Sequence, residues 1–574
     1  MKMSSATPLL VWIVTLGTSV VTVPALCHRA PSRHATRFTF VDHGAGARAV
    51  QSFRRRARRI DVGVRKTLGG TGDVPLTIHV YPTLEAKGLE TGYTMPVHSY
   101  SGRGEMYVSA EPGVRGEFER ELASLLVQAT LGRAGRDVFA EGLALYFVER
   151  WGGRPPLYWA GRLADMAGEI PLDRLTAQRS YRALSPLLRR PLAAAMISLF
   201  VKKAGWDALR TSWVTGAVPS IVSNAWPQYL RTLVRRYPHV AQRGRFAPPA
   251  PGLPHWHRGF CFAHEGYHVR DGYVSKNADR ALDRLVGLNV NAVSITPFTF
   301  MRDPNSPVRF PFSEGAGDEN DEAVIHATRG AHRRKMAVML KPHLWVPRSW
   351  PGGVDMHTPQ DWRRFFKYYE EWILHYAMLA EMTHCEIFCV GVELTQATFG
   401  HEERWVRLIH RVRRIYGGKL TYAANWGEEF EHVTFWNSLD FAGIDCYYPL
   451  STLPGATDDE LRAGAREVIR KIDTVGKRWK IPVLITEVGF TSTAATWISP
   501  HERQRGVVGD EKAQARCYDA FFRAVAKSRT VRGMYWWKWP SYLEYGGKNN
   551  TGFTPDGKAA ERVVRRWFRN PAFR

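Results

Sequence analysis

The chain has 574 residues, of which 44% are hydrophobic and 23% are charged, so we expect a folded protein of two or three domains and exclude a disordered chain. Its net charge is +25, and more than half of this excess lies in residues 28–250. No nucleic-acid-binding motif accompanies the charge, so nucleic acid is not an expected partner. Either the charge is a basic face in water, or it binds an anionic surface such as acidic polysaccharide or phospholipid headgroups.

The first 27 residues predict an export signal. Lys2 precedes an apolar stretch over residues 8–26, and small residues at 23–25 suit a signal peptidase. An uncleaved membrane anchor is the alternative, because the apolar stretch is long. In either case we expect the rest of the chain to be periplasmic, extracellular or anchored to the outer face of a membrane.

Residues 28–242 predict a mainly helical α+β domain. Its one clear strand lies at residues 76–81. Helical periodicity appears at residues 50–66, 115–131, 138–150, 192–215 and 223–236. The proline-rich stretch 243–257 predicts a linker to a second domain over residues 258–574.

Two helical segments of the first domain resemble the core of a gluzincin metallopeptidase. That family holds zinc with His-Glu-x-x-His on one helix and a glutamate on a later helix. Here Glu121 stands in the place of the general base, and Glu141, in Glu-Gly-Leu-Ala-Leu-Tyr-Phe, stands in the place of the third ligand. Arg120 and Ser124 replace both histidines. One carboxylate cannot hold a zinc ion that needs three protein ligands.

The resemblance therefore implies an inactive domain without a metal, in which Arg120 pairs with Glu141 or Glu121. An ordinary pair of helices without this ancestry is the alternative. We expect no cofactor anywhere in the chain, and the sequence predicts no oligomeric state.

The second domain alternates apolar runs with amphipathic helical segments. This α/β pattern predicts a (β/α)8 TIM barrel. The eight runs lie at residues 258–262, 290–295, 336–340, 386–390, 420–424, 441–445, 482–486 and 533–537. The active site of such a barrel lies at the carboxyl ends of its strands. The polar residues that end or follow the runs are Lys341, His343, Glu393, Asn425, Asp445, Glu487 and Lys538.

Glu393 and Glu487 are the main candidates for catalysis. Each closes a short apolar strand, where a carboxylate is costly to bury and has no role in packing. Strands four and seven face each other across the mouth of a barrel, so the two carboxylates can approach each other. A retaining glycosidase needs one carboxylic acid and one carboxylate about 5 Å apart. The pair therefore predicts the cleavage of a glycosidic bond.

The barrel sequence resembles the large clan of retaining glycosidases and, within it, the β-mannanase family 113. The motifs are Lys341-Pro-His343, Asn425-Trp426, Asp445-Cys-Tyr447 and Ile-Thr-Glu487-Val-Gly-Phe. The resemblance implies cleavage of β-1,4-mannan or glucomannan, with Glu393 as acid/base and Glu487 as nucleophile. Tyr447 would donate a hydrogen bond to the nucleophile. The implied substrate-binding residues are Lys341, His343, Asn425, Trp426, Asp445 and Trp537.

One position departs from the clan's pattern. Val392 precedes the acid/base where much of the clan has an asparagine that binds the sugar 2-hydroxyl. This change could accompany a preference for mannose, whose 2-hydroxyl is axial, or it could mark a drift in specificity or activity. The alternative to an enzyme is a barrel that binds carbohydrate without cleaving it.

Three of the supporting residues have a structural alternative. His343 is either a sugar ligand or a histidine of the barrel rim. Asp445 either contacts substrate or pairs with Lys341 or Lys538. At least one of the tryptophans at 536, 537 and 539 belongs to the core, and we assign Trp537 to the site.

Overall fold

The computed structural model describes residues 38–70, 75–111, 116–168, 170–238, 250–502 and 507–573. The predicted signal or anchor, residues 1–27, lies outside the described residues, as do residues 243–249 of the predicted linker. Across the described ranges, no helix combines the length and the apolar character that crossing a membrane requires.

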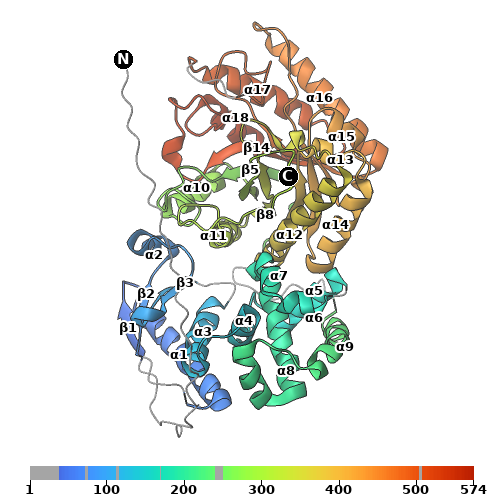
Figure 1. The fold of residues 1–574 in the computed structure, drawn as a ribbon. Coiled ribbons are helices and arrows are strands. Elements are labelled where there is room, and N and C mark those ends of the chain that lie inside the picture. The colour runs from blue at the N-terminus through green and yellow to red at the C-terminus, as the bar shows by residue number, and fades with distance from the viewer. Residues whose placement is uncertain are drawn as a thin grey trace, which may run out of the picture.

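A four-stranded sheet opens the N-terminal half. Its order is β1 (Phe38–Asp42), β2 (Leu76–Tyr81), β4 (Glu105–Ser109) and β3 (Val97–Tyr100). β3 runs antiparallel to β4, and the other pairs are parallel. β2 lies at the predicted residues, and its burial alternates, with Ile78 and Val80 fully buried and His79 partly exposed. Helix α1 (Ala47–Leu68) and α3 (Glu117–Leu131) pack against each other beside this sheet (Figure 1).

Helices make up the rest of this half, as the sequence predicts. They are α2 (Leu84–Thr91), α4 (Asp137–Tyr146), α5 (Pro156–Ala167), α6 (Leu172–Thr176), α7 (Gln178–Ala183), α8 (Pro186–Thr215) and α9 (Ser220–Arg236). α8 is kinked at Gly205, where φ is +82°. α4 ends at Tyr146, four residues before the end of the predicted segment.

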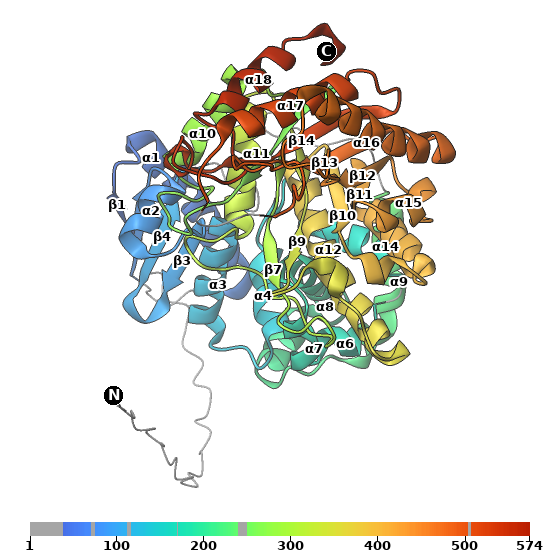
Figure 2. The same ribbon diagram turned by 90° about the horizontal axis from the view of Figure 1, so that it is seen from above.

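The C-terminal half is a closed barrel of eight parallel strands, which confirms the predicted fold class. In chain order they are β5 (His257–Ala263), β6 (Ala292–Ile295), β8 (Ala337–Leu340), β10 (Ile387–Val392), β11 (Lys419–Asn425), β12 (Phe441–Asp445), β13 (Val483–Val488) and β14 (Val531–Pro540). Small and apolar side chains, among them Cys261, Ala292 and Leu484, fill its centre. Figure 2 shows the strands surrounded by helices.

The surrounding helices are α10 (Lys276–Gly287), α11 (Asp321–Arg333), α12 (Pro359–Thr383), α14 (Glu402–Ile415), α16 (Asp458–Trp479), α17 (Glu511–Val525) and α18 (Ala559–Trp567). A side chain caps the start of most of them by accepting a backbone N–H, which stabilises the first turn. The capping residues are Ser275, Asn320, Thr358, Thr457 and Asp510.

The two halves touch through polar contacts. Thr94 donates to the carbonyl of Ala316 at 3.2 Å, and Asn320 donates to Thr94 at the same distance. His326 of α11 lies 3.0 Å from the carboxylate of Glu111. Figure 1 shows the N-terminal half, in blue to green, beneath the barrel.

Candidate active site

The two predicted catalytic glutamates lie at the carboxyl ends of β10 and β13. Glu487 is the fifth residue of β13, is 6% exposed, and is in register with Asp445 of the neighbouring strand β12. Glu393 follows β10 directly, and its backbone N–H donates to Ala423 at 2.8 Å. Its φ of +51° is left-handed, a conformation that strains a residue with a β-carbon and is concentrated at functional sites.

Both oxygens of Glu487 have a hydrogen-bond donor. The Tyr447 hydroxyl donates to Oε2 at 2.8 Å, which is the contact that the sequence predicts. The Lys341 ammonium donates to Oε1 at 2.5 Å. Charge-assisted hydrogen bonds of this kind are short and directional. The carboxylate is therefore held in one orientation, with a positive charge beside it.

Lys341 and Asp445 form a buried ion pair beneath the site. Their side chains are 0% and 1% exposed, and Lys341 Nζ lies 3.3 Å from Asp445 Oδ2. Of the two alternatives for Asp445, the ion pair with Lys341 is therefore the one confirmed, while Lys538 pairs with Glu265. Such burial does not suit the sugar contacts that the resemblance implies for both residues. Lys341 contacts Glu487, and Asp445 contacts Lys341.

The cluster distributes its charges unevenly. One ammonium, on Lys341, serves two carboxylates, on Glu487 and Asp445. Burial raises the pKa of Glu393 well above its usual value, and the charges of Asp445 and Glu487 raise it further. Burial and the charge of Glu487 also raise the pKa of Asp445, to about 7. Two glutamates with different surroundings can thus serve as an acid and a nucleophile at one pH.

The other predicted substrate residues lie at the mouth of the barrel. His343 is half-buried, and burial together with the charge of Lys341 lowers its pKa to about 4. Asn425 is half-buried at the end of β11. The Trp426 ring packs against Tyr448 and His501, with ring centroids 5.3 and 5.9 Å away.

The tryptophans of β14 divide as expected. Trp536 and Trp539 are fully buried in the core. Trp537 is half-buried and packs against the cluster that fills the centre of the barrel. The position of Trp537 therefore fits a residue that lines the mouth. Val392, which replaces the clan's asparagine, is 2% exposed and packs against Cys389 and Ala423.

Two residues that the sequence analysis missed, Tyr422 and Glu429, hold the chain segment that follows Glu393. The Tyr422 hydroxyl accepts the backbone N–H of Leu394 at 2.8 Å and donates to Glu429 at 2.6 Å. Glu429, which is 1% exposed, also accepts the backbone N–H of Asn425 at 2.6 Å. The chain segment after Glu393 is thus tied to the end of β11. Glu429 lies in a run of acidic residues, Glu428-Glu429-Phe-Glu431, so no signal separates it from its neighbours in the sequence.

Tyr422→Phe tests this support. Removing the hydroxyl leaves the Leu394 N–H without its acceptor, so we expect the position of Glu393 to loosen and kcat to fall about tenfold or more. Tyr416→Phe is the matched control, because it deletes another buried hydroxyl, one that donates to Cys385 before β10 begins. Tyr422→Phe should reduce the free energy of unfolding by about 2 kcal/mol, because Glu429 also loses a donor, and Tyr416→Phe by about 1 kcal/mol. Steady-state kinetics should show the loss of kcat in Tyr422→Phe alone; equal kinetics for the two variants would contradict the account.

A closed parallel barrel that carries two glutamates at the carboxyl ends of its strands, one of them buried and held by two hydrogen-bond donors, is the arrangement of a (β/α)8 glycoside hydrolase. The family model described as Glycoside Hydrolase Family 113 matches residues 261–558, which is more than half of the chain. The chain belongs to this family, and it is a glycosidase. A search of curated proteins found no match.

Among solved structures, the chain is similar to the GH113 beta-mannanase AaManA from Alicyclobacillus acidocaldarius in complex with ManMIm, with 27% identity and a TM-score of 0.49. That match covers 56% of this chain and 99% of the other. A second structure, of a GH113 beta-1,4-mannanase, is 25% identical over 55% of this chain and all of the other, again with a TM-score of 0.49. The Ruminococcus gnavus beta-glucuronidase is 14% identical, with a TM-score of 0.38, over 55% of this chain and 50% of its own.

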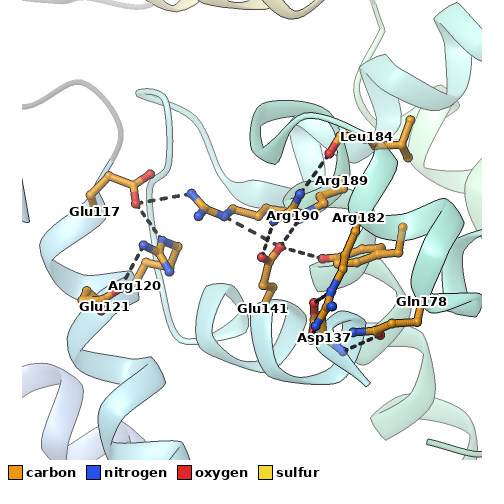
Figure 3. A network of polar contacts seen from close by, with 11 residues as sticks. Glu117, Arg120, Glu121, Asp137, Glu141, Gln178, Arg182, Leu184, Arg189 and Arg190 are labelled. Carbon is orange, nitrogen blue, oxygen red and sulfur yellow. Dashed lines mark hydrogen bonds and ion pairs between the residues drawn. The ribbon is translucent and has the colours of Figure 1, made fainter. Parts of the chain in front are cut away.

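A network of arginines and carboxylates occupies the predicted position of a zinc site in the N-terminal half (Figure 3). Arg120 donates to Glu117 at 2.7 Å and to Glu121 at 3.0 Å. Of the two partners expected for Arg120, Glu121 is therefore confirmed. Glu141 instead accepts two hydrogen bonds from Arg189, at 2.7 and 3.0 Å. Arg189 lies on α8, outside the two segments that carry the resemblance, so the sequence did not indicate it.

The same network has no arrangement suited to a metal. Arg190 lies 3.5 Å from Glu117 and 3.8 Å from Glu141, so cationic side chains surround both carboxylates. Within the described parts of the chain, no group of three or more His, Cys, Asp or Glu side chains could hold a metal ion. Ser124 is half-buried on α3.

Arg120→Ala tests whether this network stabilises the N-terminal half. Arg120 and Glu117 are only 12% and 9% exposed, so removing the arginine takes the shortest hydrogen bond from a buried carboxylate and should cost about 2 kcal/mol of stability. Arg182→Ala is the control, because the Arg182–Asp137 pair is 60% and 35% exposed and should contribute less than about 1 kcal/mol. Differential scanning calorimetry should separate the two variants; equal melting temperatures would show that the network has no structural role.

Proposed function

We propose that this glycosidase hydrolyses β-linked polysaccharide, most directly β-1,4-mannan or glucomannan, by a double displacement that retains the anomeric configuration. The observation that carries the proposal is the environment of Glu487, whose two oxygens accept hydrogen bonds from Tyr447 and Lys341. These contacts suit a nucleophile. The raised pKa of Glu393 suits the acid.

In the proposed first step, Glu393 donates its proton to the glycosidic oxygen while Glu487 attacks the anomeric carbon. The bond to the leaving sugar breaks, and a glycosyl ester forms on Glu487. In the second step, Glu393, now ionised, accepts a proton from water. The water oxygen attacks the anomeric carbon, the ester bond to Glu487 breaks, and Glu487 leaves as a carboxylate. Lys341 balances the negative charge that Glu487 carries before and after the ester.

The choice of mannan rests on family membership and on the motifs at the ends of β8, β11, β12 and β13. His343, Asn425, Trp426 and Trp537 are the proposed sugar contacts. A barrel that binds carbohydrate without cleaving it is the second candidate. It is disfavoured because a binding protein has no need for a buried ammonium shared between Glu487 and Asp445, which is costly to assemble.

We further propose that the N-terminal half descends from a gluzincin peptidase and lost its zinc when Arg120 and Ser124 replaced the two histidines. The arginine network around Glu117 and Glu141 supports this, because it balances carboxylates that a metal no longer neutralises. We also propose the domain division at residues 243–257 and export directed by residues 1–27. The basic composition of residues 28–250 is consistent with contact to an anionic surface outside the cytoplasm.

The test is reducing-sugar release by the chain from residue 28 onward, on β-mannan, glucomannan, xylan and β-glucan, beside Glu487→Ala. Release from mannan or glucomannan that disappears in the variant supports both the chemistry and the substrate. Release from another glycan alone would retain the chemistry and reject mannan. If a folded protein released sugar from none of them, the binding barrel would be the better account.

A further inference from the structure

Two short strands extend the barrel beyond its mouth. β7 (Phe298–Phe300) and β9 (His343–Trp345) follow β6 and β8, after Thr296-Pro297 and Lys341-Pro342, and pair in parallel (Figure 2). Phe298 is in register with His343, and Phe300 with Trp345. Backbone bonds from Lys341 to Ile295 and from His343 to Pro297, both 2.9 Å, join this two-stranded ribbon to the barrel without a break.

One face of the β7–β9 ribbon is packed and the other is open. Thr299 and Leu344 are 1% and 2% exposed, so they point into the protein. Alternation places the remaining side chains on the opposite face. Those are Phe298 and His343, which are half-buried, and Phe300 and Trp345, which are 55% and 53% exposed. Phe298 contacts both His343 and Trp345, with ring centroids 5.0 and 6.2 Å away, so these three rings form a continuous surface, and Phe300 is in register beside Trp345.

The inner end of this surface adjoins the catalytic centre. Lys341, which binds Glu487, stands two residues before His343 on the same extended segment. The charges of Lys341 and Glu487 both act on the His343 ring. Trp345 lies two residues further out, or about 7 Å along the strand. The aromatic surface therefore runs from the glutamate pair outward into solvent.

The chemistry of the surface fits a sugar chain. A pyranose ring offers an apolar C–H face, which packs on an aromatic ring, and hydroxyl groups at its edge, which need hydrogen-bond partners. His343 Nδ1 lies 3.0 Å from the carbonyl oxygen of Leu344 and must carry a proton to bond there. The pKa of His343, lowered to about 4, keeps the ring neutral near pH 7, so its Nε2 is an acceptor.

We propose that Phe300 and Trp345 form a binding site for sugar units of the polysaccharide that lie beyond the bond being cleaved, with His343 Nε2 accepting a hydroxyl at its inner end. The proposal rests on the proposed function, which supplies the glycan. A single exposed aromatic side chain is common on protein surfaces, but two neighbouring ones beside a catalytic site indicate a binding surface. The proposal accounts for this pair. Such a site would strengthen the binding of long substrates and would not change the rate at which the bound glycosidic bond is cleaved.

The experiment compares Trp345→Ala, Phe300→Ala and the conservative Trp345→Phe with wild type on a long and a short substrate. The long substrate is the polymer that wild type cleaves, and the short one is an aryl glycoside of the same sugar. Each alanine variant should raise KM for the polymer about tenfold, which is the effect of losing one aromatic anchor. The kcat for the polymer and the kcat/KM for the aryl glycoside should stay unchanged. Trp345→Phe should fall between wild type and Trp345→Ala. Tyr100→Ala, which removes an aromatic side chain 37% exposed on the N-terminal sheet, is the matched control and should change nothing.

A second readout keeps this proposal separate from the proposed function. Retardation in native gels containing soluble β-mannan, glucomannan or β-glucan measures binding without turnover. If wild type cleaves glycans and the alanine variants keep its KM on the polymer, the proposed binding surface is wrong and the proposed enzymatic function stands. If wild type cleaves no glycan but is retarded in the gel, and Trp345→Ala abolishes the retardation, the proposed binding surface stands and the proposed enzymatic function is wrong. Neither cleavage nor retardation would reject both, and a dimer that the alanine variants abolish would assign the surface to a second copy of the chain instead.

Discussion

Glu487→Ala is expected to lower kcat by about 10⁴-fold or more, because removing a nucleophile abolishes the covalent route and leaves only the contribution of binding. The hydrogen bonds from Tyr447 and Lys341 converge on this one carboxylate, so its removal takes away the group that both donors orient. Reducing-sugar release at saturating substrate measures the effect. Added azide should restore turnover, because a small anion can enter the space that the side chain leaves, and the product should then be a glycosyl azide of inverted configuration.

Glu386→Gln is the matched control for this prediction. Glu386 is also a buried carboxylate, 2% exposed, but it precedes β10 at the amino end of the barrel, where it accepts the backbone N–H of Val338 at 2.8 Å. Its replacement should affect stability and leave kcat near the wild-type value. Comparable losses of kcat in the two variants, or a failure of azide to restore Glu487→Ala while circular dichroism shows it folded, would contradict the assignment of the nucleophile.

Glu393→Gln is expected to lower kcat/KM on natural glycans by about 10³-fold, which is the usual contribution of a general acid. The loss should be much smaller for aryl glycosides with acidic phenols, because such leaving groups depart without a proton. Michaelis–Menten kinetics on a series of leaving groups measures the contrast. Equal losses across the series would show that Glu393 does not protonate the leaving group.

The pH dependence follows from the same residue. Glu393 must be protonated to act, and its pKa is raised by burial and by the charges of Asp445 and Glu487, so wild-type kcat/KM should fall as the pH rises through this raised pKa. The alkaline limb should disappear in Glu393→Gln. The folded state also binds this proton more tightly than the unfolded state does, so its contribution to stability is complete at low pH and is lost as the pH rises through the raised pKa. An alkaline limb that persists unchanged in the variant would assign it to another group.

The barrel could be predicted from the sequence because each strand is a short apolar run between amphipathic helices. That pattern gives all eight strands, and the geometry of parallel strands then brings Glu393 and Glu487 to one end. The Tyr447–Glu487 hydrogen bond could be predicted from the family motif. The N-terminal strands β1, β3 and β4 were missed because they are only four or five residues long and their exposed face interrupts the apolar pattern.

The depth of each side chain was the main information that the sequence lacked. Lys341 and Asp445 stand at the carboxyl ends of their strands as the other polar residues do, yet both are buried and bind each other. Spacing along a strand gives the face and the end of the barrel, but it does not say whether a group reaches the substrate. The β7–β9 ribbon escaped detection for a related reason, since three residues after a proline are too few to show a period of two.

The central claim is that Glu393 and Glu487 cleave a β-glycosidic bond by double displacement. Proton NMR of the reaction in its first minutes, on the glycan that the enzyme cleaves, tests it most directly, because the anomeric proton of the new reducing end reports its configuration before mutarotation. The account predicts that the β-anomer appears first and the α-anomer grows in later. An α-anomer formed first would mean that water attacks directly with inversion, and Glu487 would then not be a nucleophile.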